Sequence, residues 1–167
     1  MDTETKDHIF YKVWDEVDKD VGGLSMLPYG VCVPMNFTGR GILRNFGVST
    51  SVKAGSFSFP YAEKNKTENK IIKYTWDDTV APDLVSISLT GKLPELHIWL
   101  EDDITKEIID FSIFKLPDHL KSMGHKWEYP APPLYIWGDI GEAKYIESQS
   151  AIEFIMAVNE MWDNIYG

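Results

Sequence analysis

The chain has 167 residues, of which 44% are hydrophobic and 25% are charged, and it carries a formal net charge of −10 at pH 7. This length is enough to bury a substantial core, and the apolar content is too high for a disordered chain. The acidic balance argues against a nucleic-acid binder, because such proteins neutralise phosphates with clustered Lys and Arg. We expect one globular domain over residues 1–167 and no nucleic-acid partner.

The single cysteine, Cys32, rules out an internal disulfide and fits a reducing compartment. Residues 1–7 are polar and acidic, which is unlike a secretory signal. No apolar run approaches the roughly 20 residues that a membrane helix needs. We therefore expect a cytoplasmic protein without a membrane partner, while the sequence leaves its oligomeric state open.

Amphipathic periodicity predicts a helix near each end of the chain. Residues 148–165 show it, with Ser148 or Ser150 as the N-cap, and a short helix of one or two turns is predicted for residues 117–123. Residues 7–19 show it most clearly, with apolar side chains at i, i+3, i+4 and i+7: Phe10, Val13, Trp14 and Val17.

A central helix is predicted for residues 33–46, directly after Cys32. Gly47 is placed to end it in the left-handed conformation. Inside it, Gly39 and Gly41 each cost about 1 kcal/mol relative to Ala. Such glycines are tolerable where a neighbour packs closely against the helix backbone, so we expect this helix to lie buried against a sheet.

Residues rich in β-branched and aromatic side chains predict strands at 48–59, 71–76 and 84–89. A hairpin follows, with strands at 97–101 and 106–111. The order of elements, which is two helices, several strands and a helix, predicts an α+β domain with an antiparallel sheet.

The predicted hairpin brings a histidine close to an aspartate. With a four-residue loop at 102–105, Glu101 faces Lys106 and His97 lies opposite Asp110. Directly opposed residues have Cβ atoms about 4.5–5.5 Å apart, which allows a hydrogen bond between imidazole and carboxylate. Side-chain alternation places both on one face of the sheet, and a slip of one residue separates them.

Cys32, His97 and Asp110 form a candidate catalytic group. An aspartate bonded to a histidine fixes its tautomer and favours the imidazolium, and an imidazolium at the positive end of a helix stabilises a nearby thiolate. In acyl transfer the thiolate attacks a carbonyl and the histidine protonates the leaving group. Singly, each residue also has a structural explanation, because a lone buried cysteine is usually inert and a cross-strand His–Asp pair is usually only a hydrogen bond.

Four stretches around these residues carry a family resemblance: a cysteine at the head of a helix that ends Ile42-Leu43-Arg44-Asn45-Phe46-Gly47-Val48, the strand Ser51-Val52-Lys53-Ala54-Gly55-Ser56, then His97-Ile98-Trp99-Leu100-Glu101 and Ile108-Ile109-Asp110. Over roughly residues 29–112, the chain resembles the transglutaminase-like branch of the papain-like cysteine peptidase superfamily. The resemblance implies a papain-like core in which a central helix started by Cys32 packs on an antiparallel sheet, flanked by N- and C-terminal helices.

The resemblance also implies roles for individual residues. Cys32 would be the nucleophile, His97 the general base and acid, and Asp110 the residue that orients His97. The implied activity is that of a hydrolase or acyltransferase acting on a protein or on a small amide or ester, without a metal or organic cofactor. A further group of metal-ligating side chains has no recognised ligand spacing: Asp118, His119 and His125.

The sequence departs from the family pattern around the nucleophile. Papain-like enzymes often place a Gln upstream to bind the oxyanion, whereas the single glutamine here is Gln149. Pro34 and Phe37 stand where small residues are expected. The backbone N–H of Cys32 and the Tyr29 hydroxyl are the candidate oxyanion donors. These departures leave open a catalytically inactive member of the family that acts as a binding or inhibitory protein.

The aromatic and proline-rich segment 127–137 has two interpretations. It lines a substrate groove together with Trp99, in which case Trp127, Tyr135 and Trp137 contact the substrate, or it covers the core, as aromatic clusters in long loops usually do. For an inactive protein, this segment and the acidic surface are the candidate binding surfaces.

Overall fold

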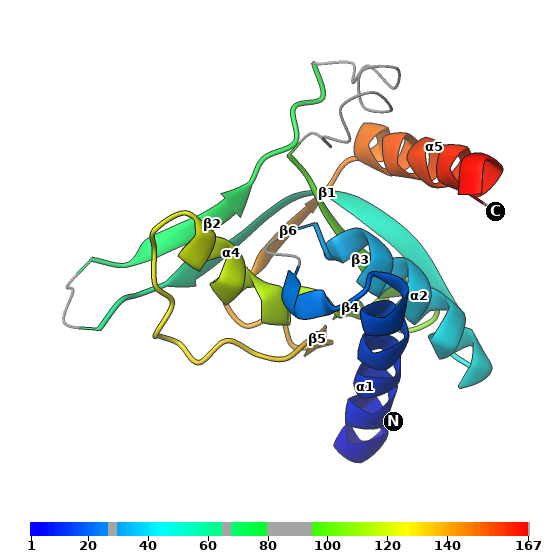
Figure 1. Cartoon of the computed structure of the whole chain (residues 1–167), viewed down its shortest axis with the longest axis horizontal. Helices are drawn as coiled ribbons and strands as arrows, with labels where there is room; N and C mark the ends of the chain where they lie inside the picture. Colours follow the sequence, from blue (N-terminus) through cyan, green and yellow to red (C-terminus); the bar gives the residue numbers. More distant parts are fainter. Residues whose placement is uncertain (27–29, 65–67, 80–94, 167) are drawn as a thin grey trace.

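The computed structural model describes residues 1–26, 30–64, 68–79 and 95–166. Over these ranges the chain is an α+β protein in which helices lie beside an open antiparallel sheet (Figure 1). The strand predicted at 84–89 lies outside the described residues. None of the helices in the described ranges is long and apolar enough to cross a bilayer. The helices are α1 (Thr3–Asp20), α2 (Cys32–Asn45), α4 (Leu116–Ser122) and α5 (Gln149–Tyr166), with short 3₁₀ helices at Leu24–Met26 and Ile113–Lys115.

The first helix confirms the amphipathic pattern and begins four residues earlier than predicted. Asp2 is its N-cap, and the Asp2 carboxylate accepts a hydrogen bond from the Thr5 backbone N–H at 2.8 Å. The first N–H groups of a helix have no acceptor within it, and the Asp2 cap provides one. The cap therefore allows the helix to begin before the first residue of the apolar pattern. The face that α1 buries consists of Ile9, Phe10, Val13 and Val17.

Helix α2 begins at Cys32, as the sequence predicts, and Gly47 follows it with φ of 80°. Gly39 lies against the ring of Phe111 so closely that a Cβ at this position would come within 2.5 Å of the ring. A Cβ on Gly41 would meet nothing within 4 Å. The expectation that a neighbour packs against the helix backbone is therefore confirmed for Gly39 alone.

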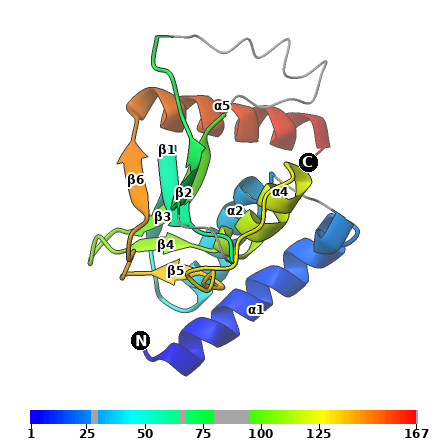
Figure 2. The ribbon, with the colours of Figure 1, turned by 90° about the vertical axis from the view of Figure 1, so that its left-hand side faces the viewer.

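The sheet has the strand order β2-β1-β3-β4-β5, with β6 also paired to β1. All of these pairings are antiparallel. Seen from the side, most of the strands lie to one side of α2 and α1, and α5 runs along the end of the sheet (Figure 2). The strands are β1 (Thr50–Tyr61), β2 (Lys70–Tyr74), β3 (His97–Asp102), β4 (Ile108–Asp110), β5 (Ile136–Trp137) and β6 (Lys144–Glu147).

The β3–β4 hairpin is present, but the predicted register is wrong by two residues. Leu100 pairs with Ile109, whereas the predicted loop at 102–105 would pair Leu100 with Glu107. The Asp102 carboxylate accepts hydrogen bonds from the next turn at 2.8 and 3.1 Å, and the Asp102 backbone continues the strand pairing. The turn therefore lies one residue later, at 103–106, and ends at Lys106 in the left-handed conformation with φ of 63°.

Two clusters of buried side chains meet along β1, and the burial pattern of β1 changes phase at Gly55. Before Gly55, Val52 and Ala54 pack in a first core with α1, α2, α5, β3 and β4. After Gly55, the buried residues belong to a second core with β2, α4 and Trp127: Phe57, Phe59 and Tyr61. A Cβ at Gly55 would come within 2.0 Å of the Ile146 carbonyl oxygen in β6, so the close approach of β6 requires glycine.

Candidate active site

His97 and Asp110 form a buried pair, as the sequence predicts. His97 Nε2 lies 2.6 Å from Asp110 Oδ2, and the two residues are 3% and 0% exposed. Extended by one residue, the observed register places Asp110 opposite Trp99, so His97 and Asp110 are diagonal neighbours. A shift of two residues keeps every side chain on its face of the sheet, and diagonal neighbours remain within reach of long side chains. The hydrogen bond is therefore present despite the wrong register.

The Asp110 carboxylate is fully provided with donors. Its Oδ1 accepts from the Ser112 backbone N–H at 3.0 Å and from the Ser112 hydroxyl at 2.6 Å. Its Oδ2 accepts from the Tyr145 hydroxyl at 2.9 Å in addition to His97. A buried carboxylate is tolerated only when it is paired and hydrogen-bonded, and Asp110 meets both conditions.

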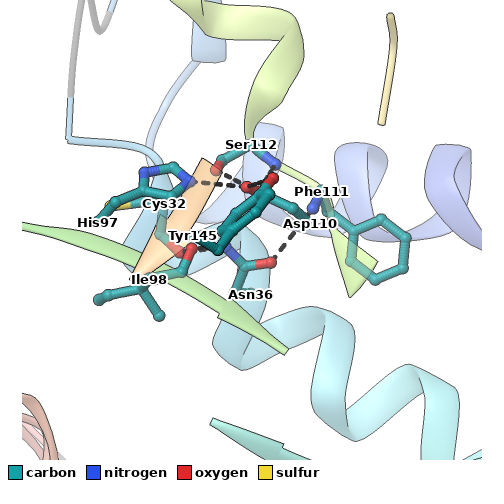
Figure 3. A network of polar contacts seen from close by, with 8 residues as sticks. All are labelled: Cys32, Asn36, His97, Ile98, Asp110, Phe111, Ser112 and Tyr145. Atoms are coloured by element: carbon teal, nitrogen blue, oxygen red, sulfur yellow. Dashed lines mark hydrogen bonds and ion pairs between the residues drawn. The ribbon is translucent and has the colours of Figure 1, made fainter. Parts of the chain in front are cut away.

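Cys32 lies at the other side of His97. Figure 3 shows the Cys32 side chain beside the His97 ring. The thiol is close enough to His97 to contribute to raising the pKa of that histidine, and Cys32 is partly exposed. Because Nε2 is bonded to Asp110, Nδ1 is the ring nitrogen that remains for the thiol. The structure thus brings the three predicted catalytic residues together in the order thiol, imidazole, carboxylate.

The electrostatics of the site favour a charged histidine at neutral pH. Burial by itself would lower the pKa of His97, but the charge and hydrogen bond of Asp110, with a contribution from Cys32, raise that pKa to about 9. Burial alone would raise the pKa of Asp110, whereas His97 and Ser112 hold it below its usual value. At pH 7, His97 and Asp110 therefore form an imidazolium–carboxylate pair.

Asn36, one turn of α2 beyond the nucleophile, joins the helix to the sheet. Its Nδ2 donates to the Cys32 carbonyl at 3.0 Å and to the Ile98 carbonyl at 2.8 Å. Its Oδ1 accepts from the Phe111 backbone N–H at 3.2 Å. Ile98 and Phe111 directly follow His97 and Asp110 in sequence, so one fully buried amide positions the backbone beside all three catalytic candidates.

Aromatic rings enclose the His97 imidazole. The Phe57 ring centroid lies 4.3 Å from that of His97, and the Tyr74 ring is stacked on it at 5.7 Å with planes 13° apart. Trp99 and Tyr145 lie at 6.4 and 6.1 Å. These rings restrict the imidazole to one orientation and keep water away from it, which strengthens its interaction with Asp110.

The start of α2 offers backbone donors beside the thiol. The N-cap, Val31, makes no side-chain hydrogen bond to the helix. In a helix, the first N–H groups have no acceptor within the helix, and Pro34 has no N–H at all. The N–H groups of Cys32 and Val33 are therefore the candidate backbone donors to an oxyanion. Tyr29, the other predicted oxyanion donor, lies outside the described residues.

The predicted groove residues lie in two places. Trp99 is buried beside His97. Trp127 is buried in the second core, 5.0 Å from the Phe59 ring. Tyr135 and Trp137 face α1, where the Tyr135 hydroxyl donates to Asp7 at 2.6 Å and Lys6 lies over the Trp137 ring. The contacts of the last three residues are those of a segment that covers the core.

The side chains of Asp118 and His119, which the sequence does not mark as metal ligands, have separate partners. His119 faces Tyr74, whereas Asp118 pairs with Lys115 at 2.9 Å. Over the described ranges, no group of three or more His, Cys, Asp or Glu side chains is arranged to bind a metal ion.

Sequence reasoning missed three residues that position the site. Asn36 carries a signal in hindsight, because it is a polar residue four positions after the nucleophile, on the same face of the helix. Ser112 carries another, since an Asp with a Ser two residues later is a common local hydrogen-bonding motif. Tyr145 comes from β6, and nothing local in the sequence links it to Asp110.

No protein-family model matches the chain, and no curated protein or solved structure matches it either. The chemistry of Cys32, His97 and Asp110 is therefore the ground on which a function is assigned.

Proposed function

We propose that the chain is a cysteine hydrolase or acyltransferase that attacks the carbonyl carbon of an amide or ester. The observation that carries this proposal is the placement of the Cys32 side chain beside His97, whose Nε2 lies 2.6 Å from Asp110 Oδ2 (Figure 3). A nucleophile, a base in contact with it and a group that orients the base are the three parts of this chemistry.

In the proposed reaction, Cys32 is held as a thiolate beside the His97 imidazolium and attacks the substrate carbonyl directly. A C–S bond forms, and the electron pair of the C=O bond moves to oxygen. The carbonyl then re-forms as the bond to the leaving group breaks, and His97 gives its proton to the departing amine or alcohol. Water or a second amine then gives a proton to the neutral His97 and attacks the thioester carbonyl, and the C–S bond breaks to release Cys32 as the thiolate, which gives hydrolysis or acyl transfer.

The arrangement of elements supports a relationship to the transglutaminase-like branch of papain-like cysteine peptidases. Cys32 is the first residue of a helix that packs on an antiparallel sheet, and His97 and Asp110 belong to adjacent strands of this sheet. In the proposed protein, Asp110 acts as a positioning residue, since it reaches the substrate only through His97.

The pH dependence of thiol alkylation tests the nucleophile. Because Cys32 is the single cysteine, iodoacetamide reports on this residue alone, and the chain unfolded in urea gives the ordinary thiol as a reference. An ordinary thiol with a pKa near 8.5 reacts roughly two hundredfold more slowly at pH 6 than at pH 9. We expect the folded protein to react less than tenfold more slowly at pH 6 than at pH 9.

Two variants complete this experiment. His97→Ala should restore the steep profile of the unfolded chain, whereas His8→Ala, a change at an exposed histidine on α1, should leave the profile flat. A folded wild-type protein with the steep profile would contradict the proposal. In that case the fold would serve binding, with the Cys32 site inactive.

A further inference from the structure

The proposed reaction builds negative charge on the substrate oxygen, and the upstream Gln that papain-like enzymes use for it is missing. The N–H groups at the start of α2 provide donors from one side. A side-chain donor that faces the site from another element would complete the oxyanion site.

Tyr74 of β2 has the required position. It pairs across the strands with Phe57, the residue whose ring lies 4.3 Å from His97. The Tyr74 ring itself is stacked on His97 at 5.7 Å, whereas Asp110 bonds to the ring edge at Nε2. Tyr74 is therefore a neighbour of the imidazole that contacts Cys32.

His119 of α4 fixes the Tyr74 hydroxyl. The hydroxyl is hydrogen-bonded to His119 Nδ1, and the two rings are stacked at 5.5 Å with planes 17° apart. In the tautomer with a proton on Nδ1, His119 donates to the Tyr74 oxygen, and the phenolic proton remains for a second acceptor. The sequence gives His119 no recognised ligand pattern, and the structure places it against a tyrosine beside His97.

The protonation states suit a donor. Burial raises the pKa of Tyr74 well above its usual value, and the negative groups nearby, Cys32 first among them, add to this rise. Tyr74 therefore keeps its proton at every pH at which the enzyme would work. Burial lowers the pKa of His119, which favours the neutral ring that can accept or donate at Nδ1.

We infer that Tyr74, fixed by His119, is the side-chain hydrogen-bond donor to the oxyanion that forms at Cys32. This inference rests on the proposed acyl transfer at Cys32. In this inference, Tyr74 stabilises the tetrahedral intermediate and takes no part in forming the thiolate. The roles of His97 and Asp110 differ, because those two residues stabilise the thiolate.

Two reactions of the same sulfur distinguish these parts. Iodoacetamide alkylates a thiolate by displacing iodide from carbon, and no oxyanion forms. p-Nitrophenyl acetate acylates it through a tetrahedral oxyanion, which collapses to the acetyl thioester as p-nitrophenolate leaves. Release of p-nitrophenolate gives the acylation rate in a single turnover, and the mass of the intact protein confirms one acetyl group on the chain.

Tyr74→Phe keeps the ring stack and removes only the hydroxyl. We expect its acylation rate to fall by roughly 10²-fold, the usual cost of one oxyanion donor, while its alkylation profile stays that of the wild type. The control Tyr11→Phe, at an exposed position on α1, should change neither rate. His119→Leu should lower acylation, and His119→Gln, which retains an N–H donor, should lower it less.

Each other outcome overturns the inference in a recognisable way. If the wild type is acylated and Tyr74→Phe is acylated at the same rate, the role of Tyr74 is overturned and the proposed function is left intact. A parallel fall of alkylation and acylation in Tyr74→Phe shows a structural role at His97 instead. A wild-type protein that is not acylated faster than its urea-unfolded form overturns both the inference and the acyl-transfer proposal.

Discussion

The amide of Asn36 donates a hydrogen bond to the carbonyl of Ile98 at 2.8 Å, across the interface between α2 and β3. The same amide accepts from the Phe111 N–H, so that one side chain sets the distance between the helix that begins with Cys32 and the strands that carry His97 and Asp110. The geometry of the candidate site thus depends on a buried polar contact between the helix and the sheet.

Replacing Asn36 with Leu should destabilise the protein by about 2–4 kcal/mol, because the change leaves the Ile98 carbonyl and the Phe111 N–H buried without partners. Urea unfolding followed by circular dichroism measures the loss. Asn45→Ala, at an exposed position near the end of the same helix, should stay within about 0.5 kcal/mol of the wild type. Equal effects of the two substitutions would show that the buried amide contributes no specific stability.

The two glycines of α2 should respond in opposite directions to alanine. Gly39→Ala should destabilise the protein by about 1–3 kcal/mol, because the new methyl group overlaps the Phe111 ring. Gly41→Ala should stabilise it by up to about 1 kcal/mol, since the methyl group meets nothing and Ala favours the helix. Thermal unfolding of the pair checks the sign, and a stabilising Gly39→Ala would contradict the observed contact.

The pKa of His97 should depend on Asp110. In the wild type, the ring proton should be lost near pH 9. In Asp110→Asn, burial acts without the carboxylate that mainly opposes it, so the pKa of His97 should fall. NMR titration of the histidine ring protons follows this change. Asp103→Asn, which alters an exposed acid in the hairpin turn, should leave the His97 titration in place.

The His97–Asp110 pair should also make stability depend on pH. Since folding raises the pKa of His97, the stabilisation is complete below about pH 6.5 and is lost as the pH rises through about 9. Since folding lowers the pKa of Asp110, the contribution of the carboxylate is present above about pH 3.8 and is lost as the pH falls through its lower, folded-state value. The pair therefore stabilises most between about pH 4 and 6.5.

Urea unfolding of the wild type and of His97→Gln at pH 5.5 and pH 9.5 isolates this contribution. The stability difference between the two proteins should shrink by about 3 kcal/mol from the lower to the higher pH, the free-energy equivalent of the change in the His97 pKa. A difference that does not change between these two pH values would contradict the charged pair.

Much of the fold follows from local pattern. The helix that Cys32 begins was predictable because Gly47 and the apolar spacing mark its extent, and the common face of His97 and Asp110 was predictable because strand alternation has a period of two. The exact register was not predictable from propensity, because Lys106 adopts the left-handed backbone conformation, which lysine rarely occupies. The Asp102 carboxylate fixes that turn, because it accepts hydrogen bonds from the backbone N–H groups of Ile104 and Thr105, which lie beyond the end of the strand.

The supporting residues of the site were harder to predict. Tyr145 reaches Asp110 because β6 pairs with β1, a strand nearly ninety residues earlier in the chain, and no sequence pattern specifies that partner. Tyr74 and His119 likewise meet only because β2 and α4 both pack in the second core. Local pattern therefore indicated the three groups of the triad, whereas contacts across the fold decide how each of them is oriented.

The bond from Tyr145 to Asp110 has a consequence for biosynthesis. During translation, Cys32, His97 and Asp110 all leave the ribosome before Tyr145, and β6 pairs with β1 only after that. A growing chain therefore contains Cys32 and His97 while the Asp110 carboxylate still lacks the Tyr145 donor. The full set of hydrogen bonds around Asp110 therefore requires a strand near the end of the chain, although the three candidate residues all come before it.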